Sequence, residues 1–230
     1  MLSEGTRNKR LESCRKLLQI LRHKNSGTVL IFSDEKIFNM NCEENRRNSR
    51  YLTRSLIKDV EPSIRFQSIT KNPSSIMYLG LICSDGRKAP LIRIPKGVKM
   101  TSDVYIRILA EKLIPWLKRN FPDGNYLFQQ DGAPCHTAKK TQDWLSENVK
   151  KFIPKDVWPP SSPDLNPLDY GIWGQLSAKI EDRKYQNLED FDKSIRMLWC
   201  KLPPSLIRKT CAAFRRRICQ VIENNGGSFE

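Results

Sequence analysis

An apolar run that ends in a carboxylate and a sharp turn is the feature that most constrains this chain. Residues 126–138 have the sequence YLFQQDGAPCHTA, so the apolar run leads directly to Asp131, and the Gly and Pro behind it break the chain. A strand over 126–130 and a helix from Thr137 would leave Asp131 where a sheet opens to solvent. In α/β layers this position is the usual place for ligand chemistry.

Two other acidic residues have comparable surroundings. Asp34 interrupts a β-branched apolar run over 28–38, and a buried strand that carries a carboxylate needs a reason. Asp169 follows the proline-rich stretch WPPSSPDLNPL, in which Pro167 suits the start of a helix, so that Asp169 falls in the first turn. An acidic residue at a helix N-terminus is also common without any function, so both interpretations of Asp169 stay open at this point.

Hydrophobic spacing and turn residues predict the other elements. A hairpin of strands is predicted over 75–83 and 89–94, a short strand near 151–153, and loops with one short strand over 41–71. Helices are predicted over 6–23, 102–120 with a Ser or Asp cap, 137–148, 188–201 and 204–224. If the strands over 28–38 and 126–130 lie parallel and adjacent, they bring Asp34 and Asp131 together.

Three carboxylates in one site repel one another unless a cation neutralises them. Hard oxygen ligands without a His or Cys cluster favour Mg²⁺ or Mn²⁺ over zinc. Two such ions about 3.5–4 Å apart serve in-line displacement at phosphorus, because one activates the attacking oxygen and the other stabilises the leaving one. A basic protein with this site is predicted to cut or join nucleic acid.

The composition is that of a basic globular protein. Its 40 Lys and Arg residues exceed its 25 Asp and Glu residues, which leaves a formal charge of +15 and favours a polyanionic partner, although a generally cationic surface is the simpler alternative.

Seven cysteines without paired spacing indicate reduced thiols. The N-terminus lacks an apolar signal core and no apolar run approaches a membrane span, so we expect no membrane association and a reducing compartment, cytosolic or nuclear.

Two basic segments are candidate DNA contacts. The first carries Arg46, Arg47, Arg50 and Arg54 around an apolar pair, and the alternative interpretation is an edge strand protected by charge. The second is the basic face of the last predicted helix, with Arg215, Arg216 and Arg217. Phosphate contacts position a protein on DNA but are poorly specified by sequence.

The chain resembles the mariner-type transposases that carry an aspartate triad, which belong to the retroviral-integrase and RNase H-like superfamily. Three motifs in order carry the resemblance: FSDEKIF, FQQDGAPCHTAKKTQDWL and WPPSSPDLNPLDYGIWG. Residues 132–168, thirty-seven in all, separate Asp131 from Asp169, which is similar to the mariner-related branch with this longer spacing and a third Asp. The resemblance covers roughly residues 10–225, and the three motifs together are highly specific.

The resemblance implies an α/β, RNase H-like fold with a mixed five-stranded sheet flanked by helices. We expect a basic linker helix in residues 1–25, the catalytic core in 26–183 and a C-terminal helical extension in 184–230. It further implies that Asp34, Asp131 and Asp169 hold two Mg²⁺ or Mn²⁺ ions, without a small-molecule cofactor. Water then attacks a phosphodiester, and the freed 3′-hydroxyl attacks target DNA. The implied partners are double-stranded transposon ends and target DNA, bound by a homodimer in the nucleus.

Several alternatives remain open. Asp164 competes with Asp169 as the third ligand, although a structural role in the rigid loop suits it better. Glu35 should point to the face of its strand opposite Asp34 and support the structure or the ligands, and His136 should stabilise the turn after Asp131 as a loop residue.

The function also has alternatives. Full-length members of the family carry two helix-turn-helix modules, whereas only about thirty residues precede Asp34, so we expect the catalytic domain alone. The alternatives are a truncated or host-adopted DNA-binding module without turnover and a ribonuclease of the same superfamily.

Overall fold

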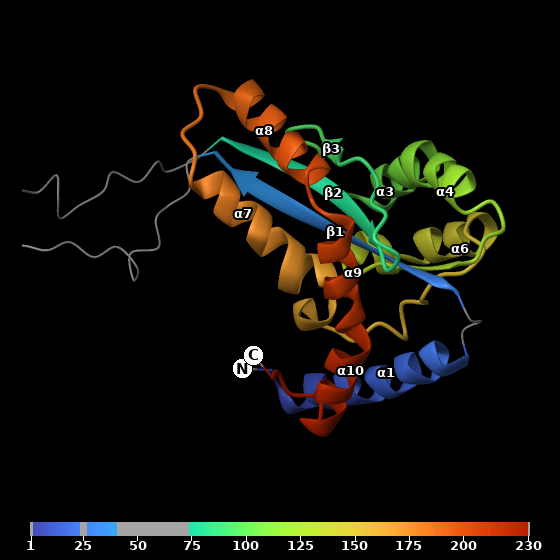
Figure 1. Ribbon diagram of the computed structural model, residues 1–230. Coiled ribbons are helices and arrows are strands. Elements are labelled where there is room, and N and C mark those ends of the chain that lie inside the picture. The colour runs from blue at the N-terminus through green and yellow to red at the C-terminus, as the bar shows by residue number, and fades with distance from the viewer. Residues whose placement is uncertain (1, 24–26, 41–73, 230) are drawn as a thin grey trace, which may run out of the picture.

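The structure is a computed structural model that describes residues 2–23, 27–40 and 74–229. Its centre is a four-stranded sheet with helices on both faces (Figure 1). The strands are β1 (Val29–Asn39), β2 (Ser75–Cys83), β3 (Ile92–Ile94) and β4 (Tyr126–Gln129), in the order β3-β2-β1-β4. β1, β2 and β3 form the predicted antiparallel meander, and β4 runs parallel to β1. The mixed sheet is therefore confirmed.

The predicted fifth strand is wrong within the described part of the chain. Near residues 151–153 the backbone makes only an isolated parallel bridge, between Phe128 and Phe152. The amide of Phe128 donates to Lys151 O at 3.0 Å and that of Ile153 to Phe128 O at 2.8 Å. Pro154 follows at once, and because proline has no N–H to donate, the ladder ends there. The short strand predicted within 41–71 lies outside the described residues.

Side chains along β1 alternate between two buried cores, as a strand covered on both faces requires. Phe32 and Phe38 belong to the first core, and Ile31 belongs to the second. The first core is closed by α1 (Glu4–His23), α7 (Gly174–Glu181), α8 (Leu188–Cys200), α9 (Pro204–Ala212) and α10 (Phe214–Glu223). The second is closed by α3 (Ser102–Ile108), η2 (Leu109–Leu113), α4 (Ile114–Asn120) and α6 (Lys139–Asn148).

The helix predicted over 102–120 is continuous but contains a π-helical stretch. Its N-cap is Thr101, whose hydroxyl accepts from the amide of Val104 at 3.4 Å, rather than a Ser or Asp within the predicted segment. Residues Leu109–Leu113 form the wider π-helical turns of η2 directly before Pro115. Proline removes one helical hydrogen bond and crowds the preceding turn, and the wider turn accommodates it.

The predicted C-terminal helix over 204–224 is two helices, α9 and α10, which meet at Ala213. At this break Phe214 enters the first core, where its ring lies edge-on to Phe32 with centroids 4.9 Å apart. The change of direction lets α10 pack along α1, so the two chain ends lie side by side (Figure 1). Among the described helices, none has the length and apolar character that crossing a membrane requires.

Candidate functional site

Asp34 is held inside the sheet by a tryptophan from a distant part of the chain. Its side chain is 8% exposed in the middle of β1. The indole Nε1 of Trp173 donates to Asp34 Oδ2 at 2.5 Å. Burial raises the pKa of Asp34, the nearby charge of Asp169 raises it further, and the hydrogen bond from Trp173 opposes both. The carboxyl group is thus fixed in place but costly to ionise without a cation.

A glycine on the neighbouring strand makes room for that tryptophan. Gly80 of β2 is the cross-strand partner of Asp34. A Cβ atom at Gly80 would lie 2.5 Å from Cη2 of Trp173, which is closer than atoms in folded proteins approach. Gly80 therefore lets the indole reach across the sheet to the carboxylate.

Asp131 lies just beyond the end of β4, as predicted, where the chain turns into the short helix α5 (Pro134–Thr137). Its Oδ1 atom accepts from the amide of Ala133 at 3.0 Å and lies 2.5 Å from Nδ1 of His136. Burial alone would raise the pKa of Asp131, but the contacts with His136 and Ala133 outweigh it and lower that pKa. Its side chain, 39% exposed, is the open member of the set.

Asp169 lies in the first turn of a helix that follows the proline-rich loop, as predicted, and this turn is the π-helical segment η4 (Leu168–Trp173). Asn166 anchors the start of η4 to the sheet, because its Nδ2 donates to Ser33 O at 3.1 Å and its Oδ1 accepts from the amide of Leu168 at 3.1 Å. Burial raises the pKa of Asp169, Lys36 opposes this effect, and the charge of Asp131 adds to it.

The three aspartates lie within electrostatic range of one another. The charges of Asp169 and Asp131 both raise the pKa of Asp34, and the charge of Asp131 raises that of Asp169. Asp131 and Asp169 also line one cleft of about 670 Å³. A divalent cation among these oxygens would relieve the mutual repulsion, so the donor set fits Mg²⁺ or Mn²⁺.

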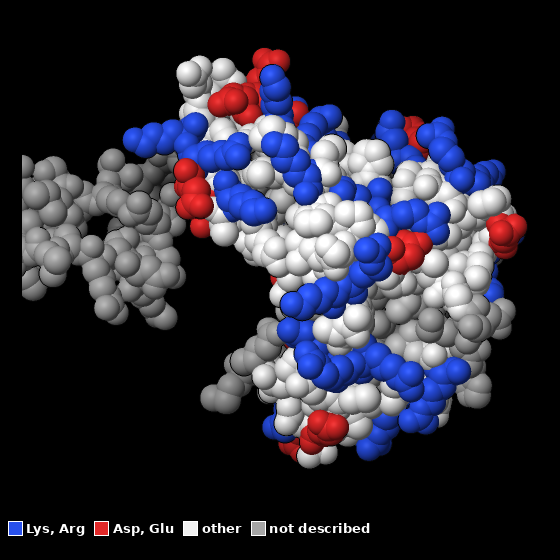
Figure 2. Space-filling view, viewed as in Figure 1, with Lys and Arg blue, Asp and Glu red and all other residues white. Residues whose placement is uncertain are grey.

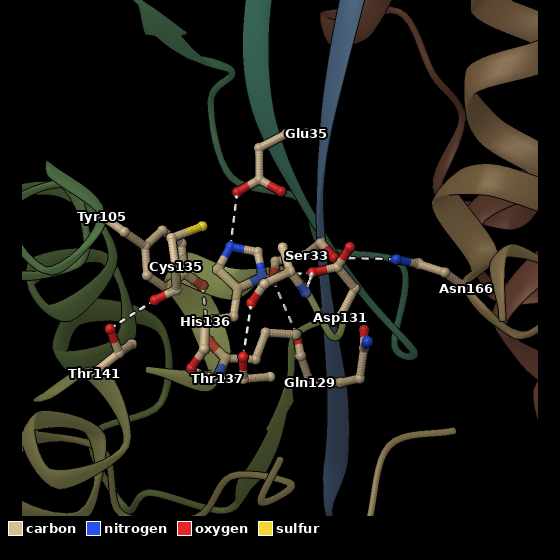
Figure 3. A network of polar contacts seen from close by, with 12 residues as sticks. Ser33, Glu35, Tyr105, Gln129, Asp131, Cys135, His136, Thr137, Thr141 and Asn166 are labelled. Carbon is tan, nitrogen blue, oxygen red and sulfur yellow. Dashed lines mark hydrogen bonds and ion pairs between the residues drawn. The ribbon is translucent and has the colours of Figure 1, made fainter. Parts of the chain in front are cut away.

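His136 and Glu35 form a second group around Asp131 that the sequence did not predict as a unit (Figure 3). The imidazole bridges the two carboxylates, with Nε2 3.2 Å from Glu35 Oε1 and Nδ1 next to Asp131. Glu35 and Asp34 face opposite sides of β1, as predicted. His136 does stabilise the turn after Asp131, but from α5 and at 2% exposure rather than from an open loop.

The environment of His136 favours its protonated form. Burial by itself would lower the pKa of the imidazole, but Tyr105, whose ring centroid lies 4.2 Å away, together with Asp131 and Glu35 raises it above its ordinary value. Ligand atoms of Glu35, Asp131 and His136 lie within 4.8 Å of one another. The only signal of this group in the sequence is proximity along the chain. Glu35 directly follows Asp34, and His136 comes shortly after Asp131.

Asp164, the competing candidate for the third ligand, is engaged elsewhere. Its Oδ2 atom lies 2.6 Å from Nη2 of Arg10, and its Oδ1 atom accepts from Nη1 of Arg10 at 3.2 Å. Both partners are buried, so this is an internal ion pair between α1 and the short helix η3 (Pro163–Leu165). The structural role suggested by the sequence therefore fits Asp164 better than a role as a metal ligand.

The arginines predicted to contact DNA differ in their exposure and position. Lys and Arg form a band over α9, α10 and α1 on the face seen in Figure 2. Arg215 and Arg216 are exposed on α10. Arg217 is partly buried, lies over the ring of Tyr170 at 3.9 Å and donates to Asp164 O at 3.0 Å. Arg46, Arg47, Arg50 and Arg54 lie outside the described residues.

A mixed sheet that gathers carboxylates at a cleft, with helices on both faces, defines an RNase H-like domain for metal-dependent chemistry at phosphodiesters. The chain belongs to the DDE superfamily endonuclease family, because residues 29–192 match the model with that description.

Relatives and solved structures agree with this membership. The chain is 28% identical over 196 residues to the transposable element Tcb2 transposase of Caenorhabditis briggsae, covering 85% of this chain and 68% of that protein. It is 28% identical over 231 residues to the Tc3 transposase of Caenorhabditis elegans, covering 98% of this chain and 64% of that one.

The fold also matches a Mos1 mariner paired-end complex with Mn, at a TM-score of 0.84 and 19% identity, over 100% of this chain and 65% of the Mos1 chain. The structure titled as the catalytic domain of Mos1 mariner transposase matches at a TM-score of 0.75 and 19% identity, over 98% of its own length. This chain therefore spans about two thirds of the longer proteins and nearly all of that catalytic domain.

Proposed function

We propose that this chain is the catalytic domain of a mariner-type transposase, which cuts DNA at transposon ends and transfers the freed strand to target DNA. The observation that carries the proposal is that Asp131 and Asp169 line one cleft of a basic endonuclease domain, within electrostatic range of the buried Asp34. The curated relatives are transposases, and one Mos1 structure is titled as a strand transfer complex. The proposed site of action is the nucleus.

In this mechanism the three aspartates would hold Mg²⁺ or Mn²⁺, which when bound would activate the attacking oxygen and stabilise the leaving oxygen. Trp173 keeps Asp34 oriented within the sheet. Asn166 fixes the turn that carries Asp169 relative to β1. His136 holds Asp131 against the turn after β4, so all three carboxylates are positioned before substrate arrives.

Cleavage of a duplex tests this proposal. The substrate carries the inverted repeats that flank the gene, and the reaction is started with Mn²⁺. Asp131→Ala should abolish cleavage because a ligand is removed, and Asp34→Ala and Asp169→Ala should do the same. Asp182→Ala is the matched control, since Asp182 is exposed at the end of α7, and it should cut like the parent.

Three results would contradict the proposal. Cleavage that persists in Asp131→Ala or in excess chelator would show that these carboxylates do not carry the reaction. DNA binding by the parent without any cleavage would favour a transposase-derived binding module without turnover. Preferential cutting of the RNA strand in a hybrid would instead indicate a ribonuclease.

The homodimer is a further part of the proposal. Two transposon ends must be handled together in cut-and-paste transposition, and three of the matched Mos1 structures are described as paired-end complexes. Sedimentation with and without an end duplex tests it. A complex that contains a single copy of the chain at saturating DNA would contradict it.

A further inference from the structure

The cleft that contains the aspartates has a second wall, which comes from the N-terminal helix. Besides Asp131 and Asp169, it is lined by Lys9, Ser13 and Lys16 of α1 and by Lys155. Carboxylates and lysines more than a hundred residues apart in sequence thus share one opening of about 670 Å³. The lysines lie outside the set of residues assigned to the reaction above.

The spacing along α1 explains why these side chains share a wall. Residues three and four positions apart lie on one face of a helix, so Lys9, Ser13 and Lys16 line up along it. The adjacent face carries Arg10 and Leu17, which are buried. The buried face therefore packs α1 against the domain. The neighbouring face directs the ammonium groups of Lys9 and Lys16 toward the cleft.

A buried arginine makes this wall rigid. Arg10 is 1% exposed, and its guanidinium donates to Gly226 O at 3.0 Å, to Ser161 O at 2.7 Å and to the carboxylate of Asp164 at 2.6 Å. These partners belong to the C-terminal turn and to the loop that leads to Asp169. The helix is therefore held at a fixed position relative to the aspartates.

We propose that Lys9 and Lys16 form a phosphate-binding wall that guides a single DNA strand past Asp131 and Asp169. This inference rests on the proposed function and adds which part of the substrate lies here. The cleft has the volume of a small-molecule pocket, on the order of 300–1,000 Å³, which suits a short stretch of one strand. Ammonium groups along a groove are the usual means of following a single-stranded backbone.

Acidic residues in the same cleft do not prevent this binding. Glu12 lies 2.6 Å from Lys16 Nζ, but the two side chains are 68% and 50% exposed, and exposed pairs of this kind contribute little. A phosphate can therefore replace Glu12 as the partner of Lys16. Asp156 lies on the wall with Lys155, so the lining outside the proposed metal ligands has three cations and two anions.

The salt dependence of DNA binding tests the proposal. Binding of a fluorescent single strand, and of the duplex of the same sequence, is measured by anisotropy in chelator, so that no strand is cut. Lys9→Ala/Lys16→Ala should lower the slope of log K against log salt by about 1.4 on the single strand, since each phosphate contact contributes about 0.7. The matched control Arg15→Ala/Arg22→Ala removes the same charge from exposed positions of α1 that do not line the cleft, and should leave the slope unchanged.

The outcomes separate this inference from the proposed function. If both double variants lower the slope of log K against log salt equally, DNA is attracted to the basic surface in general, and the proposed phosphate-binding wall is wrong. The proposal is also wrong if Lys9→Ala/Lys16→Ala leaves the slope unchanged, or if it changes the slope only on the duplex. Failure of the parent to cleave with Mn²⁺ would count against the proposed function and would leave these slopes interpretable.

Discussion

Trp173 and Asp34 are 139 residues apart in sequence, yet the indole Nε1 donates to the carboxylate Oδ2 at 2.5 Å in the middle of the sheet. The helix whose first turn carries Asp169 therefore also holds Asp34, and two of the three proposed ligands depend on one short segment, η4. The geometry of the site is set by packing across the first core as much as by the ligands themselves.

Trp173→Phe should lower cleavage by about 10- to 100-fold, because a hydrogen bond to a charged group is worth about 1.5–3 kcal/mol. The remaining ring still fills most of the space in the core. Initial rates on the end duplex measure the effect. Trp144→Phe on α6 is the control and should react like the parent. A Trp173→Phe enzyme with the parental rate would show that the indole does not orient Asp34.

Gly80→Ala should destabilise the fold by about 1–3 kcal/mol, the usual cost of overpacking a core. The added Cβ would lie 2.5 Å from Trp173 Cη2 and push the indole away from Asp34. Urea unfolding followed by tryptophan fluorescence measures the change. Gly174→Ala is the control, since no atom lies within 4 Å of the added carbon, and within a helix it should be neutral or stabilising. Equal stability of the two variants would contradict the close approach.

Arg10→Met should lower the free energy of unfolding by about 3–5 kcal/mol, because it leaves Asp164 buried and without its charged partner. Adding Asp164→Leu in the same chain should recover part of that loss, since the unpaired charge is then gone. Urea unfolding of the two single variants and the double variant gives the coupling energy. Arg15→Met, at an exposed position of α1, should change stability by less than about 0.5 kcal/mol. Additive losses from the two single changes would argue against a coupled pair.

His136→Phe should reduce cleavage by about 10- to 100-fold and raise the metal concentration needed for half-maximal rate. The change keeps an aromatic ring beside Tyr105 but removes both nitrogen contacts, to Asp131 and Glu35, each a hydrogen bond to a charged group worth about 1.5–3 kcal/mol. Tyr126→Phe, also in the second core, is the control, because it removes a hydroxyl that accepts from the amide of Lys150 and does not contact the imidazole. An unchanged metal requirement in His136→Phe would show that Asp131 needs no support from the imidazole.

Divalent metal should stabilise the folded chain. At a Mg²⁺ or Mn²⁺ concentration about 100 times the dissociation constant, the gain is about 2.7 kcal/mol, since metal binds the assembled carboxylates and not the unfolded chain. Thermal melts with metal and with excess chelator measure it. Asp34→Asn should lose most of this gain, whereas Asp182→Asn should retain it. A metal-induced shift that is the same in both variants would place the ion elsewhere.

The parts of the fold that follow local patterns were predictable. The β-branched apolar run over 28–38, the turn after Asp131 and the proline before Asp169 placed all three carboxylates on their elements without a structure. The missing fifth strand depends on Pro154, whose effect on a short parallel bridge is hard to weigh in advance. Two contacts fix the site: Trp173 with Asp34, and Arg10 with Asp164. They join residues 139 and 154 positions apart, and the hydrophobic periodicity of a sequence does not predict contacts at such separations.

The hydrogen bond from Arg10 to Gly226 O has a practical consequence for engineering. It ties α1 to the turn that follows α10, and Figure 1 shows the two ends of the chain side by side. Such a molecule suits circular permutation, because a short linker can join the old ends while new ends open in an exposed loop. A reporter or tether attached at either end would also emerge at one point, beside the wall that carries Lys9.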